Sequence, residues 1–157
     1  MPFFNIVLVE PEIPNNTGNI GRLCVGTSSH LHLVHPLGFE ISDSRVKRAG
    51  LDYWPQLKLT HHDSLSEALQ GVGEEESVYF LSSHAKHSLY SAVFNPGDWL
   101  VFGKESVGLP KGLVNENVDR ALRIPFPGEV RSFNLSNAVS MVLGEGMRQA
   151  GRRVQGS

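Results

Sequence analysis

The sequence has little of several features that mark common protein classes. Its 157 residues include a single cysteine, Cys24, so no internal disulfide can form, and this thiol falls in an apolar helical pattern that predicts burial. Long apolar runs are missing, and the N-terminus lacks the basic region and cleavage pattern of a signal peptide. We therefore expect a cytoplasmic protein that does not span a membrane and performs no redox chemistry at cysteine.

An excess of positive charge is also absent. The chain has 14 Lys and Arg residues against 16 Asp and Glu residues, which gives a formal net charge of −2. General binding to polyanions is disfavoured, because non-specific affinity for nucleic acids comes mostly from neutralising phosphates. Any RNA contact must be local, and the candidates are Arg45, Lys47, Arg48 and Arg131.

Several catalytic signatures are missing as well. The sequence has no GxxxxGK[ST] phosphate loop and no GxSxG nucleophile elbow. The histidine pairs at residues 61–62 and 84–87 have neither a cysteine nearby nor a second pair of ligands, so no metal site is predicted. These absences disfavour nucleotide hydrolysis, a hydrolase triad and zinc chemistry.

Strand-like and helix-like segments alternate along the chain. Helices are predicted around Ile20–Cys24, at Ser44–Ala49, and after a cap at Asp63 or Ser64; the last helix has an apolar stripe that should face the core. The stripe consists of Leu135, Ala138, Val139, Val142, Leu143 and Met147. The predicted strands are Phe4–Val9, Leu31–Val34, Leu57–Leu59, Ser77–Leu81, Trp99–Phe102 and Ala121–Ile124. This alternation predicts one α/β domain over residues 1–157, with a mainly parallel sheet flanked by helices and no separate RNA-binding extension.

Three loops rich in Gly, Pro and Asn follow predicted strands. They cover residues 10–22, 102–110 and 124–137. Open α/β sheets bind ligands beyond the carboxyl ends of their strands, so the three loops should meet at one edge. We expect them to form a single binding site.

The motifs in these loops resemble, in order and spacing, those of the SPOUT (SpoU-type) RNA 2′-O-methyltransferases. They read NNTGNIGR, VFGKESVGLP and IPFPGEVRSFNLSNAVS, and the likeness covers nearly the whole chain. The short length is similar to the minimal TrmL (YibK) branch, which methylates the wobble-nucleotide ribose of leucine tRNAs. The resemblance implies a sheet whose C-terminal part forms a deep trefoil knot. It also implies S-adenosylmethionine as cofactor, without a metal, and the tRNA anticodon stem-loop as substrate.

The same resemblance implies roles for individual residues. Cofactor contacts carry over to Leu81, Gly103, Ile124 and Ser132. Arg22 matches the arginine assigned to activating the ribose hydroxyl, Asn134 faces the reaction centre, and Glu105 positions Arg22 or the ribose. A guanidinium has a pKa above ~12, so binding a phosphate and stabilising the developing alkoxide is an equally good role for Arg22. Asn16 and Asn19 are expected to cap or orient the helix that carries Arg22.

The working unit is expected to be a homodimer in which Arg22 serves across the interface. The last helix should expose Ser140, Met141, Gly144 and Gly146 as a face for the partner. Two alternatives stay open: a 2′-O-methyltransferase acting on ribosomal RNA, and a knotted RNA-binding module without turnover.

Overall fold

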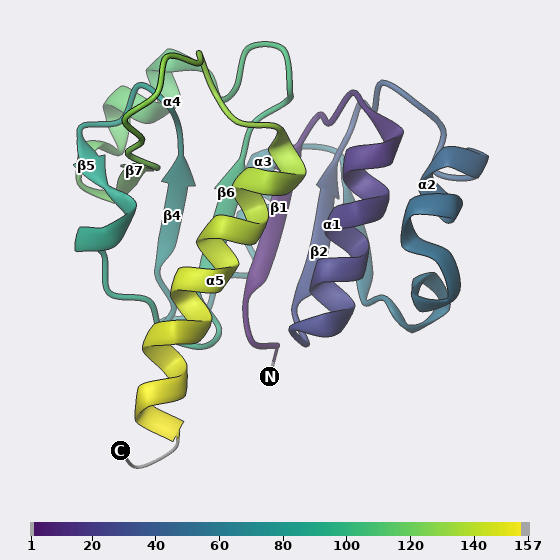
Figure 1. The fold of residues 1–157 in the computed structure, drawn as a ribbon, viewed down its shortest axis with the longest axis horizontal. Coiled ribbons are helices and arrows are strands. Elements are labelled where there is room, and N and C mark those ends of the chain that lie inside the picture. Colours follow the sequence, from purple (N-terminus) through teal and green to yellow (C-terminus); the bar gives the residue numbers. More distant parts are fainter. Residues whose placement is uncertain (1, 155–157) are drawn as a thin grey trace.

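The computed structural model describes residues 2–154, and its centre is a seven-stranded sheet in the order β3-β2-β1-β6-β4-β7-β5 (Figure 1). The strands are β1 (Asn5–Val9), β2 (His30–Val34), β3 (Leu59–His62), β4 (Val78–Leu81), β5 (His87–Ser88), β6 (Trp99–Phe102) and β7 (Ala121–Arg123). Each pair of neighbouring strands runs parallel. The predicted α/β class with a parallel sheet is therefore confirmed.

Helices cover both faces of this sheet. They are α1 (Pro14–Gly26), α2 (Ser44–Gly50), α3 (Leu65–Leu69), α4 (Lys111–Glu116) and α5 (Leu135–Val154), with short 3₁₀ helices η1 (Leu51–Gln56), η2 (Leu89–Ser91) and η3 (Val118–Arg120). Figure 1 shows α1, α2 and α5 on one face, with α3 and α4 behind the sheet. None of the helices within residues 2–154 is long and apolar enough to cross a membrane.

Strand alternation divides the core into two layers. Ile6 and Leu8 of β1 point toward α1 and α5, where they join a cluster with Ile20, whereas Val7 points to the opposite face and clusters with Ala68 of α3. Successive side chains of a strand point to opposite faces, so a strand buried on both sides is apolar throughout. Cys24 is fully buried in the first layer, as predicted, and burial raises the pKa of its thiol to about 12.

The first glycine-rich motif lies in a helix rather than in a loop. The prediction of a loop over residues 10–22 is wrong from Pro14 onward, because α1 begins at Pro14, a residue well suited to the first turn of a helix. A Cβ added to Gly18 would lie 2.5 Å from Cβ of Ala49, and one added to Gly21 would lie 2.8 Å from the Trp54 ring. These two glycines let α2 and η1 approach α1 closely.

Two other predictions need correction. The third strand spans Leu59–His62 and not Leu57–Leu59. Its two histidines pair with residues of β2, and a strand that ends in two histidines cannot be detected from apolar patterning. In α5, Met147 is 44% exposed, and Gly146 and Ala150 take the core-facing positions after Leu143. A Cβ added to Gly146 would lie 2.4 Å from the Phe4 ring, so this glycine faces the core and not a partner.

Candidate active site

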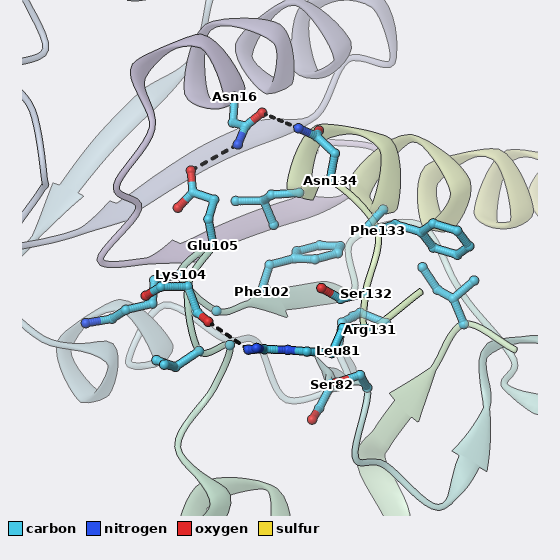
Figure 2. A pocket seen from close by; sticks show the side chains of 18 of the residues that line it. Asn16, Leu81, Ser82, Phe102, Lys104, Glu105, Arg131, Ser132, Phe133 and Asn134 are labelled. Atoms are coloured by element: carbon cyan, nitrogen blue, oxygen red, sulfur yellow. Dashed lines mark hydrogen bonds between the residues drawn. The ribbon is translucent and has the colours of Figure 1, made fainter. Parts of the chain in front are cut away.

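A cavity of about 430 Å³ opens where β4, β6 and β7 end. Leu81 and Phe102, the last residues of β4 and β6, form part of its wall (Figure 2), and Leu122 of β7 also lines it. Ligand pockets usually enclose about 300–1,000 Å³, and in open α/β sheets they lie at this edge. The cavity therefore has the size and position of a cofactor site.

All three glycine-rich segments contribute to this cavity. Its lining includes every residue expected to bind the cofactor, as well as Glu105, Asn134 and Arg131 from the other predicted groups; the expected cofactor residues are Leu81, Gly103, Ile124 and Ser132. The first segment adds Ile13 and Asn16. The structure thus brings together residues that are up to about 120 positions apart in the sequence.

Asn16 joins one residue from each of the other two segments. Its amide nitrogen donates to Oε2 of Glu105 at 3.1 Å, and its amide oxygen accepts from Nδ2 of Asn134 at 3.1 Å (Figure 2). The residue is only 4% exposed. Because donor and acceptor are both used, the amide can take only one orientation, and it fixes the three segments relative to one another.

Glu105 also anchors the start of α1. Its carboxylate accepts hydrogen bonds from the backbone N–H groups of Glu12, at 2.8 Å, and Ile13, at 2.9 Å. Backbone N–H groups at a helix start have no partner within the helix, so the carboxylate satisfies donors that would otherwise stay unpaired. Within the described chain these contacts of Glu105 are to the entry and first turn of α1, and its expected role toward Arg22 or the ribose stays a prediction.

A reciprocal contact ties the same two segments together. Glu12 accepts from the backbone N–H of Ser106 at 2.9 Å. The hydrogen bond from the Ser106 side chain is the larger cause, and that from its backbone the smaller cause, of a Glu12 pKa below the usual range. The loop after β6 and the entry to α1 therefore exchange carboxylate–amide hydrogen bonds in both directions.

Asn134 caps α5 as well as contacting Asn16. Its side-chain oxygen accepts from the backbone N–H of Ser136 at 2.9 Å and from that of Asn137 at 3.3 Å. This is the pattern of an N-cap asparagine. The side chain thus holds the start of α5 at the cavity wall.

Gly103 is required by the loop's own backbone. A Cβ at this position would lie 2.2 Å from the carbonyl carbon of Gly108, which is itself at φ +70°. Two parts of the 103–108 loop therefore approach each other closely at Gly103, and the cofactor contact expected at this residue stays a prediction.

Aromatic and charged side chains complete the walls. Phe126 and Phe133 pack with ring centroids 4.5 Å apart, while Arg131 extends across the opening and donates to the Ser106 carbonyl oxygen at 3.4 Å (Figure 2). On the opposite side, Lys104 pairs with Glu10 at 3.4 Å. The cavity combines apolar surfaces with hydroxyl, carboxylate and cationic groups.

Arg22 lies outside this cavity. It is exposed on α1, six residues beyond Asn16, and its guanidinium carbon is 5.0 Å from the ring centroid of Tyr53. At 1.5 Å per residue this places Arg22 about 9 Å further along the helix and on another side. The cavity of one chain therefore contains Glu105 and Asn134 but not Arg22.

The basic residues of α2 also lie apart from the cavity. Arg45, Lys47 and Arg48 are all exposed, which agrees with a local cationic surface. Arg45 is partly neutralised, because its guanidinium binds Asp43 at 2.9 Å. Among the candidate RNA contacts, Arg131 alone lines the cavity.

Asn16 is the residue whose importance the sequence understated. An asparagine in the first turn of a helix is commonly interpreted as a cap, yet α1 has Ile13 at its N-cap and no side-chain cap. Burial separates Asn16 from the exposed Asn15 and Asn19. The helical spacing of the polar residues 15, 19 and 22 gives a sequence signal, since at about 100° per residue Asn16 lies outside this exposed stripe.

A family model settles the wider assignment. The model described as the SpoU rRNA Methylase family matches residues 4–144. The chain belongs to this family. The resemblance inferred from the three motifs is therefore confirmed, whereas the family's knot stays a prediction for this chain.

Individual relatives agree with the family assignment. A protein of Acidovorax sp. named tRNA (cytidine(34)-2′-O)-methyltransferase is 47% identical over 149 residues, which cover 93% of this chain and 91% of that protein. A solved structure described by 2-OH methylation of C/U34 on tRNA has a TM-score of 0.89 at 43% identity and covers 94% of this chain and 96% of its own. A SpoU methyltransferase from Streptomyces viridochromogenes, solved with AdoMet, is 22% identical and shows the same fold, with a TM-score of 0.82 over 96% of this chain and 59% of its own.

Proposed function

We propose that this protein transfers a methyl group from S-adenosylmethionine to the ribose 2′-hydroxyl of nucleotide 34, the wobble position, of leucine tRNAs. The observation that carries the proposal is the bridge through Asn16, which joins one residue from each of the three family motifs beside a cofactor-sized cavity. Relatives more than 40% identical over nearly the full length are named for this tRNA reaction. A tRNA substrate supports a cytoplasmic location.

The residues present fit S-adenosylmethionine. Phe102, Leu122 and Ile124 offer apolar surfaces for an adenine ring, and Ser132 offers a hydroxyl. Arg131 supplies the cation that a carboxylate of the cofactor requires. When bound, the cofactor supplies a methyl group on a sulfonium, so the protein's task is to bring a ribose oxygen into line and manage its proton.

Arg22 acts as an electrostatic group in this proposal. Its guanidinium keeps its charge at any physiological pH, since its pKa exceeds ~12, and so it is a poor proton acceptor. A fixed cation beside the ribose binds the neighbouring phosphate and stabilises the oxyanion that develops as the hydroxyl attacks the methyl carbon and releases its proton to water. The exposed position of Arg22 makes the guanidinium accessible to RNA.

A homodimer would bring Arg22 to the cavity of a second chain. On α1, Asn15, Asn19 and Arg22 form an exposed stripe, and beside α1 the helix α5 exposes Met141, at 37%, and Met147, at 44% (Figure 1). Exposed methionines on a surface that also carries the family arginine support a partner there. We therefore propose that each active site combines one chain's cavity with the other chain's Arg22.

The direct test uses the protein with labelled cofactor and total tRNA, in the presence of a chelator. Mass spectrometry of digested tRNA should place one new methyl group on the ribose of nucleotide 34 in leucine tRNAs. Ribosomal RNA is included in parallel, because the family description names rRNA. Methylation of rRNA alone would contradict the tRNA substrate and identify rRNA in its place. Cofactor binding without transfer to either RNA would identify the protein as a binding module.

Complementation tests the shared site. A mixture of Arg22→Ala and Asn134→Ser chains should recover activity above either variant alone, because a mixed dimer contains one intact site. Serine is chosen at 134 because it still caps α5. A monomer in light scattering that is fully active at the assay concentration would contradict the dimer.

A further inference from the structure

Arg22 is held against an aromatic ring that belongs to another element. Its guanidinium carbon lies 5.0 Å from the ring centroid of Tyr53, in η1. Tyr53 is 41% exposed, so its ring is not part of the core. A guanidinium within about 6 Å of a ring centroid is attracted by the negative face of the ring. This contact restricts a long side chain that would otherwise move freely in solvent.

The segment that carries Tyr53 is anchored to α1 by the residues next to this contact. Gly21 precedes Arg22, and Trp54 follows Tyr53; a Cβ at position 21 would lie 2.8 Å from the Trp54 ring. The Trp54 ring of η1 therefore packs directly on the α1 backbone at Gly21, next to the Arg22–Tyr53 pair. One turn earlier, Gly18 packs against Val46 and Ala49 of α2 in the same way. The two glycines of the first motif thus fix the position of Tyr53 relative to Arg22.

We propose that Tyr53 is a positioning residue for methyl transfer: its ring holds the Arg22 guanidinium in the orientation in which it meets the RNA. The inference depends on the proposed function, in which Arg22 binds the phosphate or the developing oxyanion. A charged group that is already ordered loses less freedom when the transition state forms. Loss of the ring should therefore lower kcat, while the cofactor site, which lies elsewhere on the chain, stays unchanged.

A different role for Tyr53 makes a different prediction. An exposed aromatic ring near the basic residues of α2 is also suited to stacking on a nucleobase. In that role its loss would weaken tRNA binding and raise KM, with little change in kcat. The existing contact with Arg22 favours the positioning role, because the guanidinium already covers the ring.

The experiment compares Tyr53→Phe, which keeps the ring, with Tyr53→Leu, which removes it at similar size. Tyr90→Leu is the matched control, since Tyr90 is 56% exposed in η2 and does not line the cavity. We expect Tyr53→Leu to lower kcat by about three- to tenfold with unchanged cofactor affinity and melting temperature, and Tyr53→Phe to restore it. In an Arg22→Ala background, Tyr53→Leu should have no further effect on kcat.

A second measurement does not depend on turnover. NMR of the arginine Nε–H groups should show that the Arg22 side chain is ordered in the wild type and in Tyr53→Phe, and mobile in Tyr53→Leu. Wild-type kcat in Tyr53→Leu, a raised KM alone, or an Arg22 signal that stays ordered would overturn the proposal. If the wild type transfers no methyl group, the proposed function fails, and the NMR comparison still decides whether Tyr53 holds Arg22.

Discussion

The two halves of the sheet differ in the surface that they present: one half ends in a cavity, and the other carries exposed basic residues. The half with β6, β4, β7 and β5 ends in a cavity whose loops are tied together by hydrogen bonds to Glu105 and Asn134. The half with β1, β2 and β3 carries α1, α2 and η1, and it presents Arg22 and the basic residues of α2 to solvent. A small cofactor binds in an enclosed cavity, whereas a folded RNA needs an open surface. In the proposed function, the first half binds the cofactor and the second half presents Arg22 and the basic residues of α2 to the RNA.

The largest expected effect separates these two halves. Arg22→Ala should lower kcat by about 10²–10³-fold, the range found when one group that stabilises an oxyanion is removed. Cofactor affinity measured by calorimetry should not change, because Arg22 does not line the cavity. A parallel loss of cofactor binding would show that the two halves are not independent.

The next effect concerns the Asn16 bridge, which joins α1 to the loops of the cofactor half. Asn16→Asp keeps the acceptor for Asn134 but replaces the amide donor by a carboxylate oxygen about 3.1 Å from Oε2 of Glu105. We expect a loss of about 1–3 kcal/mol in the free energy of unfolding at pH 7, with weaker cofactor binding. Urea unfolding measures the first quantity and calorimetry the second.

Asn19→Asp is the control for this change. Asn19 lies on the same helix, but its side chain is exposed. The control should unfold within about 0.5 kcal/mol of the wild type, as surface substitutions usually do. Equal effects of the two variants would mean that charge on α1, and not the bridge, determines the loss.

Sequence and structure agree best where apolar patterning decides the outcome. The strands around Ile6 and Leu100 and the inward face of α5 through Leu143 follow from burial on one or both faces. The meeting of the three loops follows from the rule that parallel strands end at one edge. Family motifs supplied the identities of the residues at that edge.

The remaining features depend on contacts between distant parts of the chain. The buried Asn16 side chain bonds with Glu105 and Asn134, which are about 90 and 118 positions away from it in the sequence. The strand β3 lies later in the sequence than predicted, and its His62 bonds with His32 of β2. The inward face of α5 differs from the predicted apolar stripe after Leu143, where Gly146 packs on the Phe4 ring. Local propensity contains none of this information.

Gly146 tests the packing of α5 across the boundary between the two halves. It contacts Phe4, which leads into β1, and a Cβ there would lie 2.4 Å from Cε2 of that ring. Gly146→Ala should cost about 1–3 kcal/mol, the usual range for overpacking a dense core. Thermal unfolding measures this, and Phe4→Leu in the same chain should recover part of the loss by making room. No recovery would place the clash elsewhere.

Acid should lower the free energy of unfolding through His32, in β2. Asn5 donates to the Gly97 carbonyl, so its side-chain oxygen accepts from Nε2 of His32, whose Nδ1 then accepts from His62. Burial, followed by the neighbouring His30 and His62, lowers the pKa of His32 to about 3. The unfolded chain binds this proton below pH ~6.5 while the folded chain does not, so stability falls between pH 6.5 and pH 3, by up to ~1.4 kcal/mol per pH unit. Urea unfolding from pH 7.5 to pH 5 should show a shallower slope for His32→Gln than for the wild type; equal slopes would exclude His32 as the cause.

The smallest effect should come from Gly144, two residues before Gly146 but on the outward side of α5. Within the described chain no heavy atom lies within 4 Å of a Cβ built there, apart from the helix backbone and adjacent residues. Alanine restricts the unfolded chain and favours the helix, so Gly144→Ala should raise the free energy of unfolding by about 0.5–1 kcal/mol. The two glycine variants should thus change stability in opposite directions, as measured by urea unfolding at several protein concentrations. The contrary outcome is a loss of stability for Gly144→Ala that grows with protein concentration. It would mean that a partner helix packs directly on Gly144. The outward face of α5 would then be closely packed in the assembly, as the inward face is in the single chain.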